Sequence, residues 1–409
     1  MTLLLAYSVV LLVAVLVSAL AHRTVLSTAV LFLAAGFVLG DELTGVVPFG
    51  PNDEIVSTLA ELALFAVLFT DGMRVGWRDL RAAWRLPGRA LGWGLPLTLL
   101  ATALLAHYVA GLGWVEALLI GAVLAPTDPV FAAALVGNEK VPRRLRHLLN
   151  VESGLNDGLA LPIVIVLLEI ARRSHDLHFA ELGVELVLGV VIGVTVPWVA
   201  IRLERSRLFS AAEHYQAINA VAIGLLVFSL GTITDGNLFL AAFAAGITVA
   251  TIGHQEKKAF HEFGDLIAEL LKLAALFVFG ALISPSFLSE IPWTGWIFAV
   301  LAVVIARPVA LWISFWRSGL SPREQAAAMW FGPKGFASVV YGLLVLNSGI
   351  PAADEIFHLV ALTIALSIVA HSSSDVLVAR QFDEAREVPA WFSAARRRAR
   401  RRTQRPPRS

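Results

Sequence analysis

Long apolar stretches recur along the chain, separated by short segments that hold most of the charged residues. A transmembrane helix needs close to 20 apolar residues, and each stretch approaches or exceeds that length. Irregular backbone cannot face lipid, because its peptide groups would lack hydrogen-bond partners. The pattern predicts an all-α polytopic membrane protein with about thirteen transmembrane helices, at residues 3–22, 25–40, 55–73, 88–110, 114–136, 148–171, 180–201, 213–231, 237–253, 266–284, 294–316, 324–346 and 354–379.

The composition agrees with a membrane protein. Hydrophobic residues make up 57% of the 409 residues and charged residues only 15%, whereas soluble domains average about 25% charged residues. No lysine or arginine precedes Arg23, so the first stretch lacks the basic start of a signal peptide and is predicted to be a true span. Cysteine is absent, which excludes disulfides, thiol catalysis and cysteine-bound metals.

Lysine and arginine are unevenly distributed between the predicted loops. The loops after odd-numbered spans carry 17 of them, counting Arg89 at the start of the fourth span, and the loops after even-numbered spans carry only Arg172 and Arg173. Since basic residues mark cytoplasmic loops, the N-terminus is predicted outside and the C-terminus inside a cell (inner or plasma) membrane. Residues 381–409 are rich in arginine and are predicted to form a basic cytoplasmic tail that contacts anionic lipid, not nucleic acid.

Two of the predicted spans are interrupted near their middle. The fifth contains Ala125-Pro126-Thr127-Asp128-Pro129, and the twelfth contains Gly332-Pro333-Lys334-Gly335. Proline removes a backbone donor and disfavours helix at the preceding residue. Each of these spans is therefore expected to consist of two half-helices with an unwound joint, where free carbonyl groups can coordinate an ion.

Matching breaks in corresponding spans are typical of inverted repeats that meet at a site in the membrane. We expect two inverted repeats of six spans, in which the broken spans 5 and 12 cross. The repeats would cover about residues 1–171 and 213–380, with span 180–201 as the link. Residues 1–380 are thus predicted to form one transmembrane domain.

The sixth span carries the densest group of polar residues, Glu152-Ser153-Gly154-Leu155-Asn156-Asp157. A carboxylate at the centre of a membrane helix costs about 2.5–3.5 kcal/mol on insertion scales. Ser153 and Asp157 are four residues apart and share one face of the helix, and Glu152 and Asn156 share the neighbouring face. The spacing indicates an ion site on one face and structural partners on the other.

Other charged residues in the spans suggest ion pairs. Arg307 lies inside the eleventh span, and Glu152 is its predicted counter-ion because an unpaired buried charge is costly. Lys334 lies in the break of the twelfth span, where we expect it to balance a negative helix end and Asp128. Lys272, near the start of the tenth span, is predicted to pair along its own helix or to extend to the membrane surface.

These motifs resemble the monovalent cation:proton antiporters, and more narrowly their Asn-Asp branch, the NhaP and NHE-type sodium/proton exchangers. The resemblance rests on Thr-Asp-Pro in one broken span, Glu-Ser-Gly-x-Asn-Asp-Gly in the next, and a later Ala-Arg span, and it covers nearly the whole chain. One departure is Lys334, where this branch usually has arginine. Lysine keeps the charge but not the planar fork, which bears on ion preference and pH dependence more than on exchange itself.

The resemblance implies roles for particular residues. Asp157 would bind the cation and the proton in alternation, and Na⁺ would also contact the Thr127 carbonyl and the Ser153 hydroxyl. The resemblance further implies that three residues support one another beside the site: Asn156, Glu152 and Arg307. Additional acidic candidates for ion contact are Asp128, Asp71 and Glu61, although Asp71 is also explained by solvation at a helix end. A homodimer is implied as well.

The predicted function is secondary active sodium/proton antiport rather than an enzymatic reaction. Burial disfavours the charged form of Asp157, so either a proton or a cation can neutralise the site, but not both at once. If the site crosses the membrane only when it is neutral, the flux of the proton is coupled to the flux of the cation. Because Asn156 stands where a second carboxylate could be, the exchange is predicted to be electroneutral, one proton for one cation. No cofactor is expected besides the transported H⁺ and Na⁺, Li⁺ or K⁺.

Several alternatives remain open from the residues. Potassium/proton exchange fits the same oxygen ligands, and other ion-coupled secondary transport, such as organic anion symport, is also compatible. A passive channel would more often show a ring or filter repeat. An intramembrane aspartyl protease would carry Gly-x-Gly-Asp, which this chain lacks. The chain also lacks a nucleotide-binding loop, which argues against ATP-driven pumping.

Overall fold

The computed structural model describes residues 2–21, 28–50, 53–74, 86–128, 135, 138, 140–172, 179–206 and 215–384, so most of the predicted basic tail lies outside the described residues. Every predicted span contains a helix in this part of the chain. The helices are α1 (Thr2–Ala21), α2 (Thr28–Leu39), α3 (Glu54–Arg74), α5 (Leu86–Arg89), α6 (Leu95–Leu105), α7 (Trp114–Leu124), α9 (Arg143–Ala171), α10 (Phe179–Glu204), α11 (Gln216–Ile233), α12 (Leu238–Ile252), α13 (His254–Leu282), α14 (Pro285–Glu290), α15 (Trp293–Leu301), α16 (Arg307–Ser314), α17 (Pro322–Trp330), α18 (Phe336–Leu346) and α19 (Ala353–Glu384).

Helix length and composition support a multi-pass membrane protein. Turns of π-helix at Ala90–Gly94, Ala106–Ala110 and Ala302–Ala306 join neighbouring helices into continuous segments. Among the described residues, six helical segments are long and apolar enough to cross a membrane: Glu54–Arg74, Leu86–Ala110, Arg143–Ala171, Ala180–Glu204, Trp293–Ser314 and Ala353–Phe382. The other apolar helices are shorter, and two of them, α7 and α18, flank the predicted breaks.

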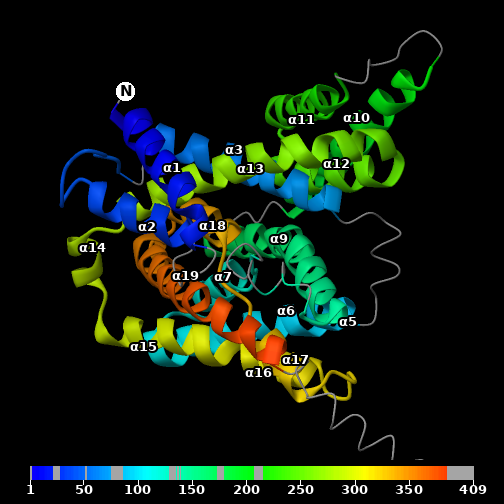
Figure 1. Cartoon of the computed structure of the whole chain (residues 1–409). Coiled ribbons are helices and arrows are strands. Elements are labelled where there is room, and N and C mark those ends of the chain that lie inside the picture. The colour runs from blue at the N-terminus through cyan, green and yellow to red at the C-terminus, as the bar shows by residue number, and fades with distance from the viewer. Residues whose placement is uncertain are drawn as a thin grey trace, which may run out of the picture.

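The helices form two bundles that lie against each other (Figure 1). The first bundle contains α1–α3 and α10–α13. The second bundle contains α5–α7, α9 and α15–α19. Helix α3 of the first bundle contacts α9 and α18 of the second, and α13 contacts α18, which places the sixth and twelfth predicted spans at the junction.

Two helix crossings in the first bundle repeat the same geometry. A Cβ atom on Gly72 of α3 would meet the main chain of α12, and one on Gly246 of α12 would meet the main chain of α3. Gly36 of α2 and Gly280 of α13 approach each other in the same way. Such close helix contacts require small residues. In the predicted repeats, α2 of the first half corresponds to α12 of the second half, and α3 corresponds to α13. Inverted repeats therefore predict that the pairs α3–α12 and α2–α13 have equivalent geometry.

The two breaks meet inside the second bundle, as the sequence predicts. Helix α7 ends at Leu124, and residues 331–335 separate α17 from α18. The main-chain N–H of Asp128 donates a hydrogen bond to the Pro333 carbonyl at 2.9 Å. A Cβ atom on Gly335 would overlap the Asp128 side chain, so glycine permits this contact. The continuation of the fifth span after Asp128 lies mostly outside the described residues.

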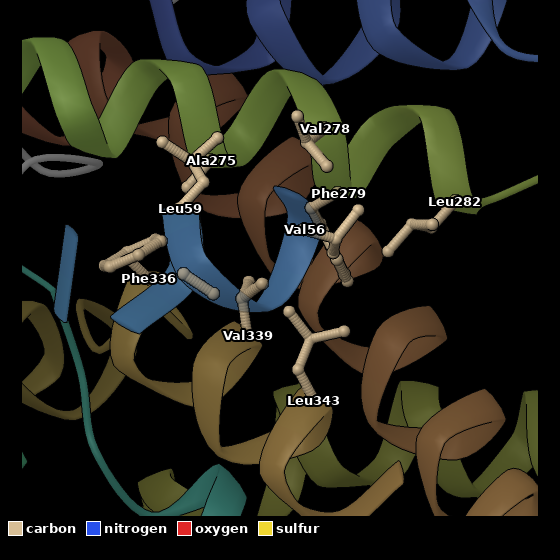
Figure 2. Close-up of a pocket in the computed structure, with 10 residues that line it drawn as sticks. Val56, Leu59, Ala275, Val278, Phe279, Leu282, Phe336, Val339 and Leu343 are labelled. Atoms are coloured by element: carbon tan, nitrogen blue, oxygen red, sulfur yellow. The ribbon is translucent and has the colours of Figure 1, made fainter. Parts of the chain in front are cut away.

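Apolar side chains from both bundles line a small pocket at the end where α3 begins (Figure 2). We call this lining the apolar seam; it consists of Val56, Leu59, Ala60, Ala275, Val278, Phe279, Leu282, Phe336, Val339 and Leu343, from α3, α13 and α18. Val56 and Asp71 are 15 residues apart on α3, or about 22 Å along a helix. The seam therefore lies well away from the charged residues at the other end of α3.

Candidate ion-binding site

Asp157 is a buried carboxylate with no bonding partner in the described structure. It lies on α9 and is 5% exposed. Its side chain forms no hydrogen bond or ion pair with any described residue, although Asp71, Asp128 and Lys272 act on it electrostatically. An isolated buried charge is strongly disfavoured, so this group needs a proton or a cation to neutralise it.

Neutral oxygen atoms from the break and from α9 lie beside this helix face. The Asn156 amide donates hydrogen bonds to Thr127 Oγ1 at 2.7 Å and to the Thr127 carbonyl at 3.3 Å. The hydroxyl groups of Thr127 and Ser153 are 3.4 Å apart. All three residues are buried. Asn156 thus fixes the unwound segment after α7 against α9, and Thr127 and Ser153 supply the hard oxygen donors that suit an alkali cation.

The predicted pairing of Asp128 with Lys334 is wrong, because the cation at Asp128 is Lys272. Lys272 Nζ on α13 lies 3.2 Å from Asp128 Oδ2, and both side chains are buried. Lys334 Nζ has no hydrogen-bond partner among the described residues and interacts with Glu152 and Arg307 instead. The half-helix arrangement directs Lys334 towards α9 and α16, which a position in the linear sequence does not indicate.

The two weaker acidic candidates have different environments. Asp71 is buried near the end of α3, within 3.3 Å of Arg74, whose guanidinium also contacts Asp265 of α13. Asp71 therefore belongs to the charged group around Asp157, rather than to a solvated helix end. Glu61 is exposed on α3, ten residues or about 15 Å along the helix from Asp71. No contact described in the structure connects Glu61 to the site.

Glu152 and Arg307 form the ion pair that the sequence predicts. Arg307 Nη1 lies 2.6 Å from Glu152 Oε1, and both side chains are buried. Arg307 Nη2 also donates to the carbonyl groups of Ala328 at 3.4 Å and Phe331 at 3.2 Å, at the end of α17. This arginine therefore connects α9, α16 and α17 and satisfies carbonyls that the break leaves without helical partners.

The break in the twelfth span is also held from α19. Ser367 Oγ accepts a hydrogen bond from the Lys334 main-chain N–H at 2.8 Å. His371, one turn further on, places Nε2 2.9 Å from the Trp330 carbonyl and Nδ1 2.7 Å from the Ser367 carbonyl. Ser367 and His371 thus hold the two ends of the break at a fixed separation.

Sequence reasoning missed Lys272, His371 and Tyr341 as residues of this region. Tyr341 on α18 donates a hydrogen bond to the main-chain oxygen of Asp157 at 2.8 Å. The available signal for Lys272 was a lysine within an apolar span, but acidic residues earlier in the same helix suggested a local pair. Spacing within one helix does not predict partners on another bundle.

Comparison with known proteins identifies relatives over most of the chain. The family described as "Sodium/hydrogen exchanger, transmembrane" matches residues 9–379. A K(+)/H(+) antiporter, NhaP2, of Shewanella baltica is 25% identical over 90% of this chain and 64% of its own length. A probable Na(+)/H(+) antiporter of Schizosaccharomyces pombe is 28% identical over 80% of this chain and 46% of its own length. The chain thus spans less than two thirds of these relatives.

A solved structure has the same fold. The sodium proton antiporter MjNhaP1 from Methanocaldococcus jannaschii superposes with a TM-score of 0.75, covering 93% of this chain and 99% of its own, at 19% sequence identity. At this identity the likeness establishes the fold. It agrees with the predicted all-helical, polytopic architecture.

Proposed function

The chain belongs to the sodium/hydrogen exchanger transmembrane family, a family of transporters and not of enzymes, and we propose that it exchanges a monovalent alkali cation for a proton. The observation that carries this proposal is the unpartnered, buried carboxylate of Asp157. It lies on the same face of α9 as Ser153, whose hydroxyl is 3.4 Å from that of Thr127. The other buried acids near it have basic neighbours: Asp128 pairs with Lys272, and Asp71 pairs with Arg74.

Competition at Asp157 would couple the two fluxes. A proton removes the negative charge, and so removes the attraction that holds a cation. A bound cation neutralises the same carboxylate and so excludes the proton. Moving the bare carboxylate through an apolar environment is costly. The site would therefore cross the membrane when loaded with either ion and would remain in place when empty.

The arrangement supports an exchange of one proton for one cation. Asn156 stands beside Asp157 and is engaged with Thr127 by two hydrogen bonds, so it adds no second titrating group. With Asp71 and Asp128 paired to basic residues, one carboxyl group remains to be neutralised in each crossing. The cycle is then electroneutral.

Sodium is the cation that we propose first, with potassium as the second candidate. Carboxylate, carbonyl and hydroxyl oxygens coordinate either ion. The family description and the fission yeast relative favour sodium. The antiporters of Shewanella baltica and Alkalimonas amylolytica, the latter 26% identical over 85% of this chain, are named for potassium.

The distribution of basic residues supports an orientation with the end of α3 that carries Arg74 in the cytoplasm. The apolar seam at the other end of α3 then closes the outer side of the junction, and the charged residues face the inner side. The absence of cysteine allows single introduced cysteines to report the orientation by labelling from either side of the membrane.

We further propose a homodimer in a cell membrane, on the strength of the family resemblance.

Proteoliposomes with a pH-sensitive dye inside and an outward proton gradient test the exchange itself. Sodium, lithium and potassium are added separately to vesicles that contain the wild type, Asp157→Asn or Asp354→Asn. Asp354 is an exposed acid at the start of α19 and serves as the matched control. We expect cation-driven proton flux in the wild type and the control, and none in Asp157→Asn. Flux that survives in Asp157→Asn would contradict the proposed site.

A further inference from the structure

Among the ion pairs of the described residues, that of Lys272 with Asp128 joins the two bundles. The described ion pairs of Arg74 with Asp71 and Asp265 lie within the first bundle. Those of Arg144 with Glu324 and of Arg307 with Glu152 lie within the second bundle. Lys272 on α13 instead pairs with Asp128 on the other side of the junction, at 3.2 Å.

The pair is buried and lies within the charged group around the ion site. Lys272 is 7% exposed, and Asp128 is 5% exposed. Asp71 and Arg74 also act on Lys272 electrostatically, and Lys272 acts on Asp157. The Lys272 ammonium group is thus a fixed positive charge of the protein. It lies where the carboxylates of Asp128 and Asp157 would otherwise attract mobile cations.

We propose that Lys272 is a positioning residue that sets the affinity of the site for the transported cation. It neutralises Asp128 from the opposite bundle, so that Asp157 remains the one carboxylate available to the ion. This proposal rests on the proposed exchange function, and it removes the Asp128 side chain from the predicted cation ligands. The Asp128 carboxylate instead holds the first bundle against the break.

The proposal predicts opposite effects for the two halves of the pair. Lys272→Gln leaves Asp128 as an additional buried negative charge, so the cation should bind more tightly. Asp128→Asn leaves Lys272 as an unbalanced positive charge, so the cation should bind more weakly. At the separations within such a group, one charge changes binding by about tenfold or more. The double variant restores the charge balance and should return to within about threefold of the wild type.

The experiment measures the apparent KM for sodium and for potassium in proteoliposomes that contain the wild type, the two single variants, the double variant and Lys272→Arg. Arg202→Gln, which removes an exposed basic residue from α10, is the matched control. We expect KM to fall in Lys272→Gln, to rise in Asp128→Asn, and to stay near the wild-type value in the double variant, Lys272→Arg and the control.

A binding measurement covers variants that do not transport. The cation concentration that gives half-maximal thermal stabilisation of the purified protein reports affinity without turnover. Shifts of both single variants in the same direction, or no shift in either, would overturn the role of Lys272 while leaving exchange by the wild type intact. Absence of both exchange and cation-dependent stabilisation in the wild type would overturn the proposed function, and this proposal with it.

Discussion

The hydroxyl of Tyr341 on α18 donates a hydrogen bond to the main-chain oxygen of Asp157 on α9, at 2.8 Å. Both residues are buried. The bond ties the half-helix after the second break to the residue that carries the proposed ion site. Together with the bond from Asn156 to Thr127, it fixes α9 to both broken spans.

Tyr341→Phe removes this bond and keeps the ring. A buried hydrogen bond contributes about 1 kcal/mol to stability. We expect a small loss of thermal stability and an exchange rate reduced several-fold, because Asp157 is less well positioned. Tyr7→Phe is the matched control, since Tyr7 donates a similar bond to the Leu270 carbonyl within the first bundle. Equal loss of transport in both variants would assign the effect to general stability.

Asn156→Ala frees the Thr127 hydroxyl and carbonyl from their donor. Loss of a buried hydrogen-bond partner costs about 1–3 kcal/mol. The unwound segment after α7 should then be less ordered, and the half-saturating cation concentration should rise in a thermal-shift titration. An unchanged affinity with lower stability would show that Asn156 acts on the fold and not on the ion site.

Arg307→Met leaves Glu152 buried without its counter-ion and removes two donors from carbonyls at the end of α17. Breaking a buried ion pair from one side typically costs about 3–5 kcal/mol. We expect little folded protein on size-exclusion chromatography. Adding Glu152→Gln should recover part of it, because the carboxylate that lost Arg307 is then replaced by a neutral amide. If the double variant is no more stable than the single variant, the bonds to the carbonyls are the main contribution.

Gly332→Ala tests the tight fit at the second break. A Cβ atom there would overlap the Arg307 side chain, so the guanidinium must move away from Glu152. We expect lower thermal stability and loss of most exchange activity. Gly92→Ala is the control, because no atom lies within 4 Å of the position that its Cβ would take. Wild-type behaviour of Gly332→Ala would show that the ion pair tolerates displacement.

Hydrophobic pattern and local chemistry predict much of this structure. Each apolar stretch contains a helix, because a peptide in lipid must satisfy its own hydrogen bonds. The prolines of the fifth and twelfth spans predict both breaks, and the cost of an unpaired charge predicts the pair of Glu152 with Arg307. These inferences depend on properties of one segment or on a single strong energetic requirement.

The ion pair of Asp128 with Lys272, which crosses the junction between the bundles, could not be predicted in this way. Lys334 was the predicted partner of Asp128 and Lys272 was predicted to pair along its own helix, because the sequence does not indicate which bundle face either lysine would reach. Lys272 reaches Asp128 because α13 crosses beside the break, whereas Lys334 points towards Glu152 and Arg307. His371 was missed for the same reason, since one of its partners is the Trp330 carbonyl, at a break in another helix.

Competition between proton and cation at Asp157 is tested most directly by the pH dependence of the apparent KM for the cation. In wild-type proteoliposomes, KM should rise about tenfold for each unit by which the pH falls, once the proton predominates at the site, while the maximal rate stays constant. A KM that does not depend on pH, with a maximal rate that falls instead, would contradict a single shared carboxylate.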